Sequence, residues 1–150
     1  MSTVKLGGDK MKSNKKSSVL VCVTGQYECD RLIHKGYELA QKDGIELHVL
    51  CVHTPISNTA FLSEEIEYLY QKSKNLGADM TIAFNKDAPT TAADFAKKIK
   101  AKDIVTGIPS SRDGFVDILH DLLPKSNITM VTKEGDLLTH CLMSDIKVTA

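Results

Sequence analysis

The groups best suited to binding an anion lie in residues 107–114, whose sequence is Gly-Ile-Pro-Ser-Ser-Arg-Asp-Gly. Gly107 and Gly114 would let the backbone approach a ligand closely. Ser110, Ser111 and Arg112 could donate hydrogen bonds to a phosphate, assisted by the N-terminus of a following helix. A structural interpretation is equally open. Ser110 with the aspartate three residues later matches a capping box, which would satisfy that helix's own N–H groups.

A second candidate segment follows the first apolar run of the chain. Thr24 and Gly25 would allow a ribose or a phosphate to come close. Glu28 and Asp30 suit the first turn of a helix electrostatically, but they disfavour a polyphosphate at the same place. This segment therefore predicts a ligand that is neutral, weakly charged or screened by magnesium.

No arrangement typical of catalysis is present in the sequence. The motifs G-x-G-x-x-G, G-x-x-x-x-G-K-[ST] and G-x-S-x-G are absent, and the five histidines are scattered. His53 is the one histidine of interest, because it follows an apolar run that predicts a buried strand. The four cysteines show no C-x-x-C pair, so we expect no metal site. We expect no catalytic residues and no enzymatic activity.

The elements that must position these residues follow from the hydrophobic pattern. Unbroken apolar runs indicate strands buried on both faces, and apolar residues at helical spacing indicate the helices between them. Five strands are expected, at 19–23, 47–52, 80–84, 103–107 and 128–132. Four helices are expected at 29–43, 62–76, 88–99 and 115–123, with Asp87 as a cap and Pro89 in a first turn.

This alternation predicts an α/β fold with a doubly wound, Rossmann-like parallel sheet. The third and fifth strands are the more polar ones, which places them at the edges and gives the strand order 3-2-1-4-5. Ligands of such sheets bind beyond the carboxyl ends of the strands at the switch point, here between strands one and four. The apolar residues after position 135 would add a strand beside the fifth or form a dimer contact.

Composition limits the remaining possibilities. With 150 residues and a formal net charge of +0, the chain is long enough for one domain and too neutral for a typical nucleic-acid binder. No apolar run is long enough for membrane insertion, and no secretory leader is evident, so we expect a cytoplasmic protein. Residues 1–17 hold five lysines and one aspartate, and we expect a flexible basic tail there. Residues 18–150 would form the domain.

Three stretches resemble a known family. Residues 19–39 (VLVCVTGQYECDRLIHKGYEL), 47–55 (LHVLCVHTP) and 76–111 are similar to the corresponding strands and helices of universal stress proteins. The nearest resemblance is to the stress-protein-like cytosolic domain of osmosensitive potassium-channel sensor histidine kinases. In that domain the first strand likewise ends in V-C-V-[ST]-G and the second in V-x-T-P.

The resemblance implies the same doubly wound fold, homodimers formed through the last strand and C-terminal segment, and, in some members, an adenine nucleotide such as ATP. Residue by residue, it assigns ligand contacts to Thr24, Gly25, Val52, Gly107, Ser110 and Gly114. The ATP-binding branch has an aspartate where this chain has Thr24, a glycine where it has Ser110, and a Gly-[ST] pair that is missing here. The expected function is a regulatory or signalling module without enzymatic activity. The alternatives are an ATP-binding stress protein with slow hydrolysis and an ATP pyrophosphatase relative, although the S-G-G-x-D-S loop of the latter is absent.

Overall fold

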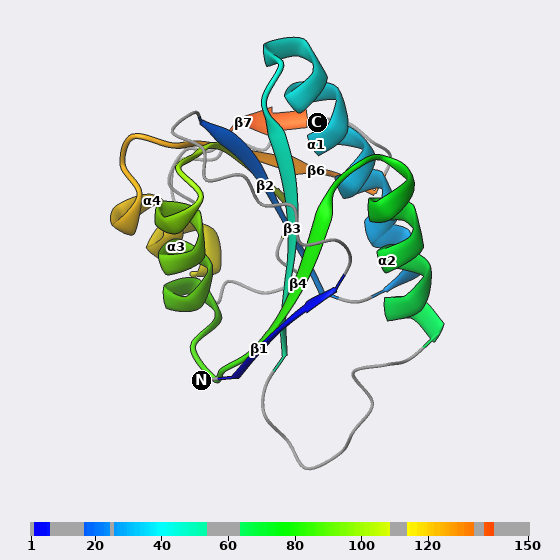
Figure 1. Ribbon diagram of the computed structural model, residues 1–150. Coiled ribbons are helices and arrows are strands. Elements are labelled where there is room, and N and C mark those ends of the chain that lie inside the picture. The colour runs from blue at the N-terminus through cyan, green and yellow to red at the C-terminus, as the bar shows by residue number, and fades with distance from the viewer. Residues whose placement is uncertain are drawn as a thin grey trace.

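Five parallel strands form the centre of the protein. The computed structural model describes residues 2–6, 17–24, 26–53, 64–108, 114–133 and 137–139. The parallel strands are β2 (Ser18–Val23), β3 (Glu46–His53), β4 (Asp79–Phe84), β5 (Ala101–Gly107) and β6 (Asn127–Val131). Their spatial order is β4-β3-β2-β5-β6 (Figure 1). The predicted order 3-2-1-4-5 is therefore confirmed.

Two further strands extend this sheet to seven. β1 (Ser2–Leu6) pairs antiparallel with β4, and β7 (Leu137–Thr139) pairs antiparallel with β6. The expectation that the third and fifth strands are edges was wrong, because β1 and β7 occupy those edges. Residues 2–6 of β1 belong to the segment for which a flexible basic tail was expected. The strand predicted after position 135 is present as β7.

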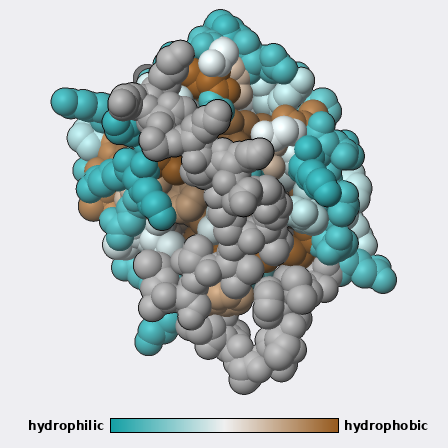
Figure 2. Space-filling view, viewed as in Figure 1, coloured by the Kyte–Doolittle hydropathy of each residue, from teal (hydrophilic) through white to brown (hydrophobic). Residues whose placement is uncertain are grey.

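The helices cover the two faces of the sheet in pairs. The 3-10 turn η1 (Tyr27–Cys29), α1 (Asp30–Asp43) and α2 (Glu64–Asn75) lie on one face. On the other face lie α3 (Ala88–Lys98) and α4 (Phe115–Leu122) (Figure 1). Each pair packs on its own cluster of buried apolar side chains, one centred on Val21 and the other on Leu20. Hydrophilic residues cover both flanks of the molecule, where α2 and α3 lie (Figure 2). None of the described helices combines the length and the apolar composition needed to cross a bilayer.

Helix ends follow the predicted signals, with one exception. Gly44 ends α1 in the left-handed conformation, at a φ of 65°, and Asp87 caps α3 by accepting a hydrogen bond from the N–H of Thr90 at 3.1 Å. The exception is α4, whose N-cap is Gly114 with a φ of 80° and without a side-chain cap. The expected capping box, which begins at Ser110, lies outside the described residues.

Candidate functional site

The carboxyl ends of β2 and β5 lie next to each other and form the switch point of the sheet. The two strands pair in parallel, with Val21 opposite Val105. Thr24 follows β2 and is exposed, and Gly107 is the last residue of β5. The Thr24 hydroxyl donates a hydrogen bond to Oε1 of Gln26, the residue that precedes η1. Of the predicted site residues, Gly25, Ser110, Ser111 and Arg112 lie outside the described residues.

Arg31 is a cation that contacts the carboxyl end of β6. Its three guanidinium nitrogens donate to backbone carbonyls: Nη1 to Glu28 at 2.7 Å, Nε to Thr132 at 2.9 Å and Nη2 to Val131 at 3.4 Å. A guanidinium carries five N–H donors, so two remain without a protein acceptor in the part of the chain described here. The first turn of α1 thus places the Arg31 guanidinium at the carboxyl ends of β5 and β6, with three of its five N–H groups hydrogen-bonded.

Sequence reasoning did not single out Arg31. Its partners at the end of β6 are 100 and 101 residues away, and no local pattern encodes such a contact. One signal was available. A cation in the first turn of a helix is opposed by the helix dipole, so an arginine there needs another reason to be present.

Gly107 lies beside that guanidinium. A Cβ built on Gly107 would lie 3.7 Å from Nη2 of Arg31 and 3.8 Å from Cδ1 of Leu32, both ordinary contact distances. The absence of a side chain at Gly107 is therefore not demanded by packing. It keeps the end of β5 accessible next to two available donors.

Val52 and His53 end β3, the strand beside β2 on the side away from β5. The His53 ring stacks on Phe84, with centroids 6.3 Å apart and an interplanar angle of 24°. Its Nε2 is buried and has no hydrogen-bond partner among the described residues. A buried polar nitrogen without a partner is costly, so this atom is a plausible point of contact for a ligand or a water molecule. Gly114, in contrast, stands at the start of α4 on the opposite face of the sheet from α1.

The predicted acidic residues lie where expected, in the first turns after β2. Glu28 is exposed in η1, and Asp30 opens α1. The Asp30 carboxylate accepts a hydrogen bond from the Tyr68 hydroxyl at 2.6 Å. One of the two charges is thus directed toward α2 and partly compensated there, while Glu28 still opposes a polyphosphate.

The cysteines of this region are free thiols. Burial raises the pKa of both Cys22 and Cys51 to about 12, so both are protonated at neutral pH. No group of three or more metal-ligating side chains occurs within the described ranges.

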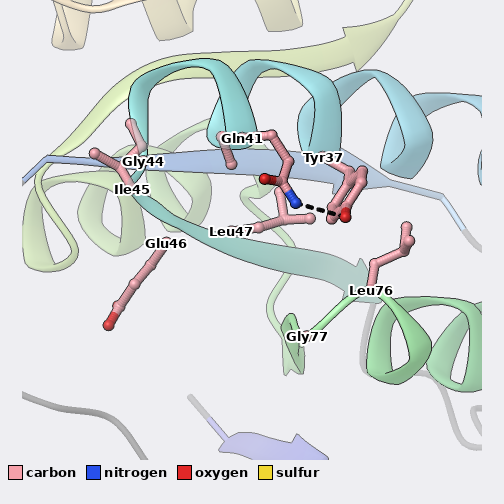
Figure 3. A pocket seen from close by; sticks show the side chains of 9 residues that line it. Tyr37, Gln41, Gly44, Ile45, Glu46, Leu47, Leu76 and Gly77 are labelled. Atoms are coloured by element: carbon pink, nitrogen blue, oxygen red, sulfur yellow. Dashed lines mark hydrogen bonds between the residues drawn. The ribbon is translucent and has the colours of Figure 1, made fainter.

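A separate cavity of about 180 Å³ lies near the amino end of β3, between the C-terminal ends of α1 and α2 (Figure 3). Tyr37, Gln41, Leu47 and Gly77 contribute to its lining, and the Gln41 amide donates to the Tyr37 hydroxyl at 2.5 Å. Pockets for cofactors are typically about 300–1,000 Å³. This cavity is too small for a nucleotide and was not predicted from the sequence.

Comparisons with known proteins agree with this geometry. No protein-family model matches the chain. It is 28% identical over 92 residues to the sensor protein KdpD of Mycobacterium tuberculosis, in two strains. The match covers 61% of this chain, and it spans only 11% of the length of KdpD.

Solved universal stress proteins share the fold. The protein from Archaeoglobus fulgidus superposes with a TM-score of 0.59 at 18% identity, covering 75% of this chain and 91% of that one. The A. fulgidus protein in complex with dAMP gives 0.53 at 20% identity, and a universal stress protein in complex with cAMP gives 0.59 at 19%; both cover 78% of this chain and 97% of the other. The chain therefore has the universal stress protein fold. More particularly, its sequence is similar to a segment of KdpD, which confirms the predicted resemblance.

Proposed function

We propose that this chain is a regulatory module of the universal stress protein type that binds a small adenine nucleotide at the switch point and acts without catalysis. Two comparisons support the proposal: proteins of the same fold are known in complex with dAMP and cAMP, and the sequence relative is a sensor protein. Thr24, Gly25, Val52, His53 and Gly107 would contact the ligand.

The observation that carries this proposal is the position of Arg31. Three backbone carbonyls fix its guanidinium beside the open end of β5, and two donors remain for an anion. A guanidinium held in this way is suited to a phosphate, which accepts two parallel hydrogen bonds. Gly107 has no side chain, so the phosphate would approach the backbone at the end of β5.

The charge balance favours a monophosphate or a cyclic phosphate over a triphosphate. One arginine and one helix N-terminus can compensate about one phosphate, whereas Glu28 repels any further charge at close range. ATP would need a cation to screen that repulsion. We therefore expect AMP-like ligands to bind more tightly than ATP in the absence of magnesium.

Calorimetric titration with AMP, cAMP, ATP and GMP tests the proposal. We expect AMP or cAMP to bind, and Arg31→Gln to weaken binding by about 10-fold or more, the loss of one charge-assisted interaction. Lys102→Gln is the matched control, because it removes a cation from the amino end of β5, where Lys102 pairs with Asp43 at 2.8 Å. Equal effects of the two substitutions, or no binding of any nucleotide, would refute the proposal. Sustained phosphate release from ATP would replace it with the slow-hydrolysis alternative.

We also propose that two copies pair through β7 and the C-terminal segment. The support is the position of β7 at one end of the sheet order, where its outer side pairs with no strand among the described residues. Sedimentation analysis should show a dimer that is lost when Leu138 is replaced by proline and retained when Val4, in the other edge strand, is replaced in the same way. Dissociation by both substitutions, or a wild-type monomer, would contradict this arrangement.

A further inference from the structure

Two tyrosines form an exposed aromatic pair where η1 meets α2. Tyr27 is 47% exposed and Tyr68 is 37% exposed. Their rings are arranged edge to face, with centroids 5.4 Å apart and an interplanar angle of 70°. The pair holds two large rings at the surface in a fixed mutual orientation. Aromatic side chains that remain partly in water in this way are typical of the centres of binding surfaces.

Carboxylates lie on the elements that carry this pair and on the adjoining start of α1. They come from η1, from the start of α1 and from the first turns of α2: Glu28, Asp30, Glu64, Glu65 and Glu67. The ion pairs formed among the described residues lie elsewhere and use none of these five. Arg31, which follows Asp30 in the sequence, directs three of its five donors to backbone carbonyls at the end of β6 and in η1. Within the described residues, these five side chains, here called the acidic rim, form no ion pair, and Asp30 is partly compensated by the Tyr68 hydroxyl.

The Tyr68 hydroxyl is held in place by this rim. It donates to Asp30 at 2.6 Å, and this hydrogen bond raises the pKa of Tyr68 above its usual value. The ring of Tyr68 is thus fixed by its contact with Tyr27 at one side and by the Asp30 carboxylate at its tip. Tyr27 has the larger exposed fraction, so a partner would reach its ring first.

We infer that Tyr27 and Tyr68, with the acidic rim, form a docking surface for a basic, arginine-bearing segment of a partner protein. Charge complementarity identifies the partner, because an acidic rim attracts a positively charged segment. The aromatic centre selects arginine in particular, because a guanidinium stacks on a tyrosine face while its donors reach the carboxylates beside it. This inference is independent of nucleotide binding.

A peptide-binding experiment tests it. The probes are a fluorescein-labelled peptide of alternating arginine and serine, and a lysine–serine peptide of the same length and charge, measured by anisotropy at low and high salt. The arginine peptide should bind at low salt, and its affinity should fall about 10-fold or more at high salt, as expected for screened charges. Tyr27→Ala should weaken the arginine peptide about 3- to 5-fold and the lysine peptide less than about twofold, the scale of one exposed cation–π contact. Tyr27→Phe should bind like the wild type.

Charge controls separate this surface from general electrostatic attraction. Glu64→Gln with Glu67→Gln should weaken both peptides, whereas Asp94→Asn, a similar neutralisation on the exposed side of α3, should weaken neither. Circular dichroism and thermal unfolding confirm that each variant is folded. Equal losses with Asp94→Asn, or equal losses of both peptides with Tyr27→Ala, would overturn the inference.

A second copy of the chain is the competing occupant, because residues 1–17 carry five lysines. Sedimentation at low salt decides between the two. The proposal of a partner protein would be overturned if the chain self-associates and if two sets of substitutions each abolish this self-association. The first set replaces Lys10, Lys12, Lys15 and Lys16 with glutamine, and the second combines Glu64→Gln with Glu67→Gln. Peptide binding by a wild-type chain whose association state is unchanged by these substitutions supports it.

Discussion

Replacing Gly107 with alanine separates the stability of the fold from ligand binding. The new methyl group would meet Nη2 of Arg31 at 3.7 Å and Cδ1 of Leu32 at 3.8 Å, so the fold can accept it without strain. Gly107 is not among the glycines with a positive φ. The substitution also restricts the unfolded chain. We therefore expect the ligand-free protein to gain about 0.4–1 kcal/mol of stability.

The same methyl group should impair nucleotide binding, because it occupies the space beside the Arg31 donors. A ligand at 100 times its Kd stabilises the native state by about 2.7 kcal/mol. If alanine at position 107 weakens binding about 30-fold, the stabilisation at the same ligand concentration falls to about 0.9 kcal/mol by the same relation. The two effects of Gly107→Ala thus have opposite signs.

Chemical denaturation with and without AMP measures both quantities. Gly77→Ala is the matched control. Gly77 precedes β4, at the amino ends of the strands, and has a φ of 78°. Alanine there should therefore cost about 1–2 kcal/mol and leave the AMP-induced stabilisation unchanged. Destabilisation of the ligand-free protein by Gly107→Ala, or an undiminished response to AMP, would refute the reasoning.

Three further predictions follow from packing, capping and burial. Gly36→Ala should destabilise the protein by about 1–3 kcal/mol despite alanine's higher helix propensity, because its Cβ would lie 2.3 Å from Cγ2 of the buried Val21; urea unfolding checks this, and a gain in stability would contradict it. Asp87→Ala should cost about 1 kcal/mol by removing the α3 cap, and Asp87→Asn should cost less in the same assay. Because burial raises the pKa of Cys22 and Cys51 to about 12, the unfolded state releases these thiol protons first. Unfolding free energy should therefore fall as pH rises above about 9, by up to about 1.4 kcal/mol per pH unit per thiol. Replacing both cysteines with alanine should flatten that slope relative to the wild type.

The central fold could be predicted because its signals are local. A strand buried on both faces is apolar at successive positions, as at Val19 to Val23, and a helix on the sheet repeats its apolar residues every three to four positions. The edge strands depend on signals that are not local. β1 was not predicted, and β7 was one of two possibilities for the residues after position 135. β1 and β7 have five and three residues, and their pairing with β4 and β6 depends on partners distant in sequence.

The candidate site was predicted only in outline. Strand order and the switch-point rule located Thr24 and Gly107 at neighbouring strand ends. Arg31 was missed, because its role depends on carbonyl groups about 100 residues away. The unpartnered Nε2 of His53 could likewise not be foreseen, since burial of a single atom depends on the packing around Phe84.

Amide chemical shifts recorded during a titration with AMP test the location of the site most directly. The account predicts the largest changes at Thr24, Val52 and Gly107, at the carboxyl ends of three neighbouring strands. It predicts negligible changes at Gln41 and Gly77, which line the cavity near the amino end of β3. Saturable changes centred on Gln41 and Gly77, with none at Thr24 or Gly107, would contradict it.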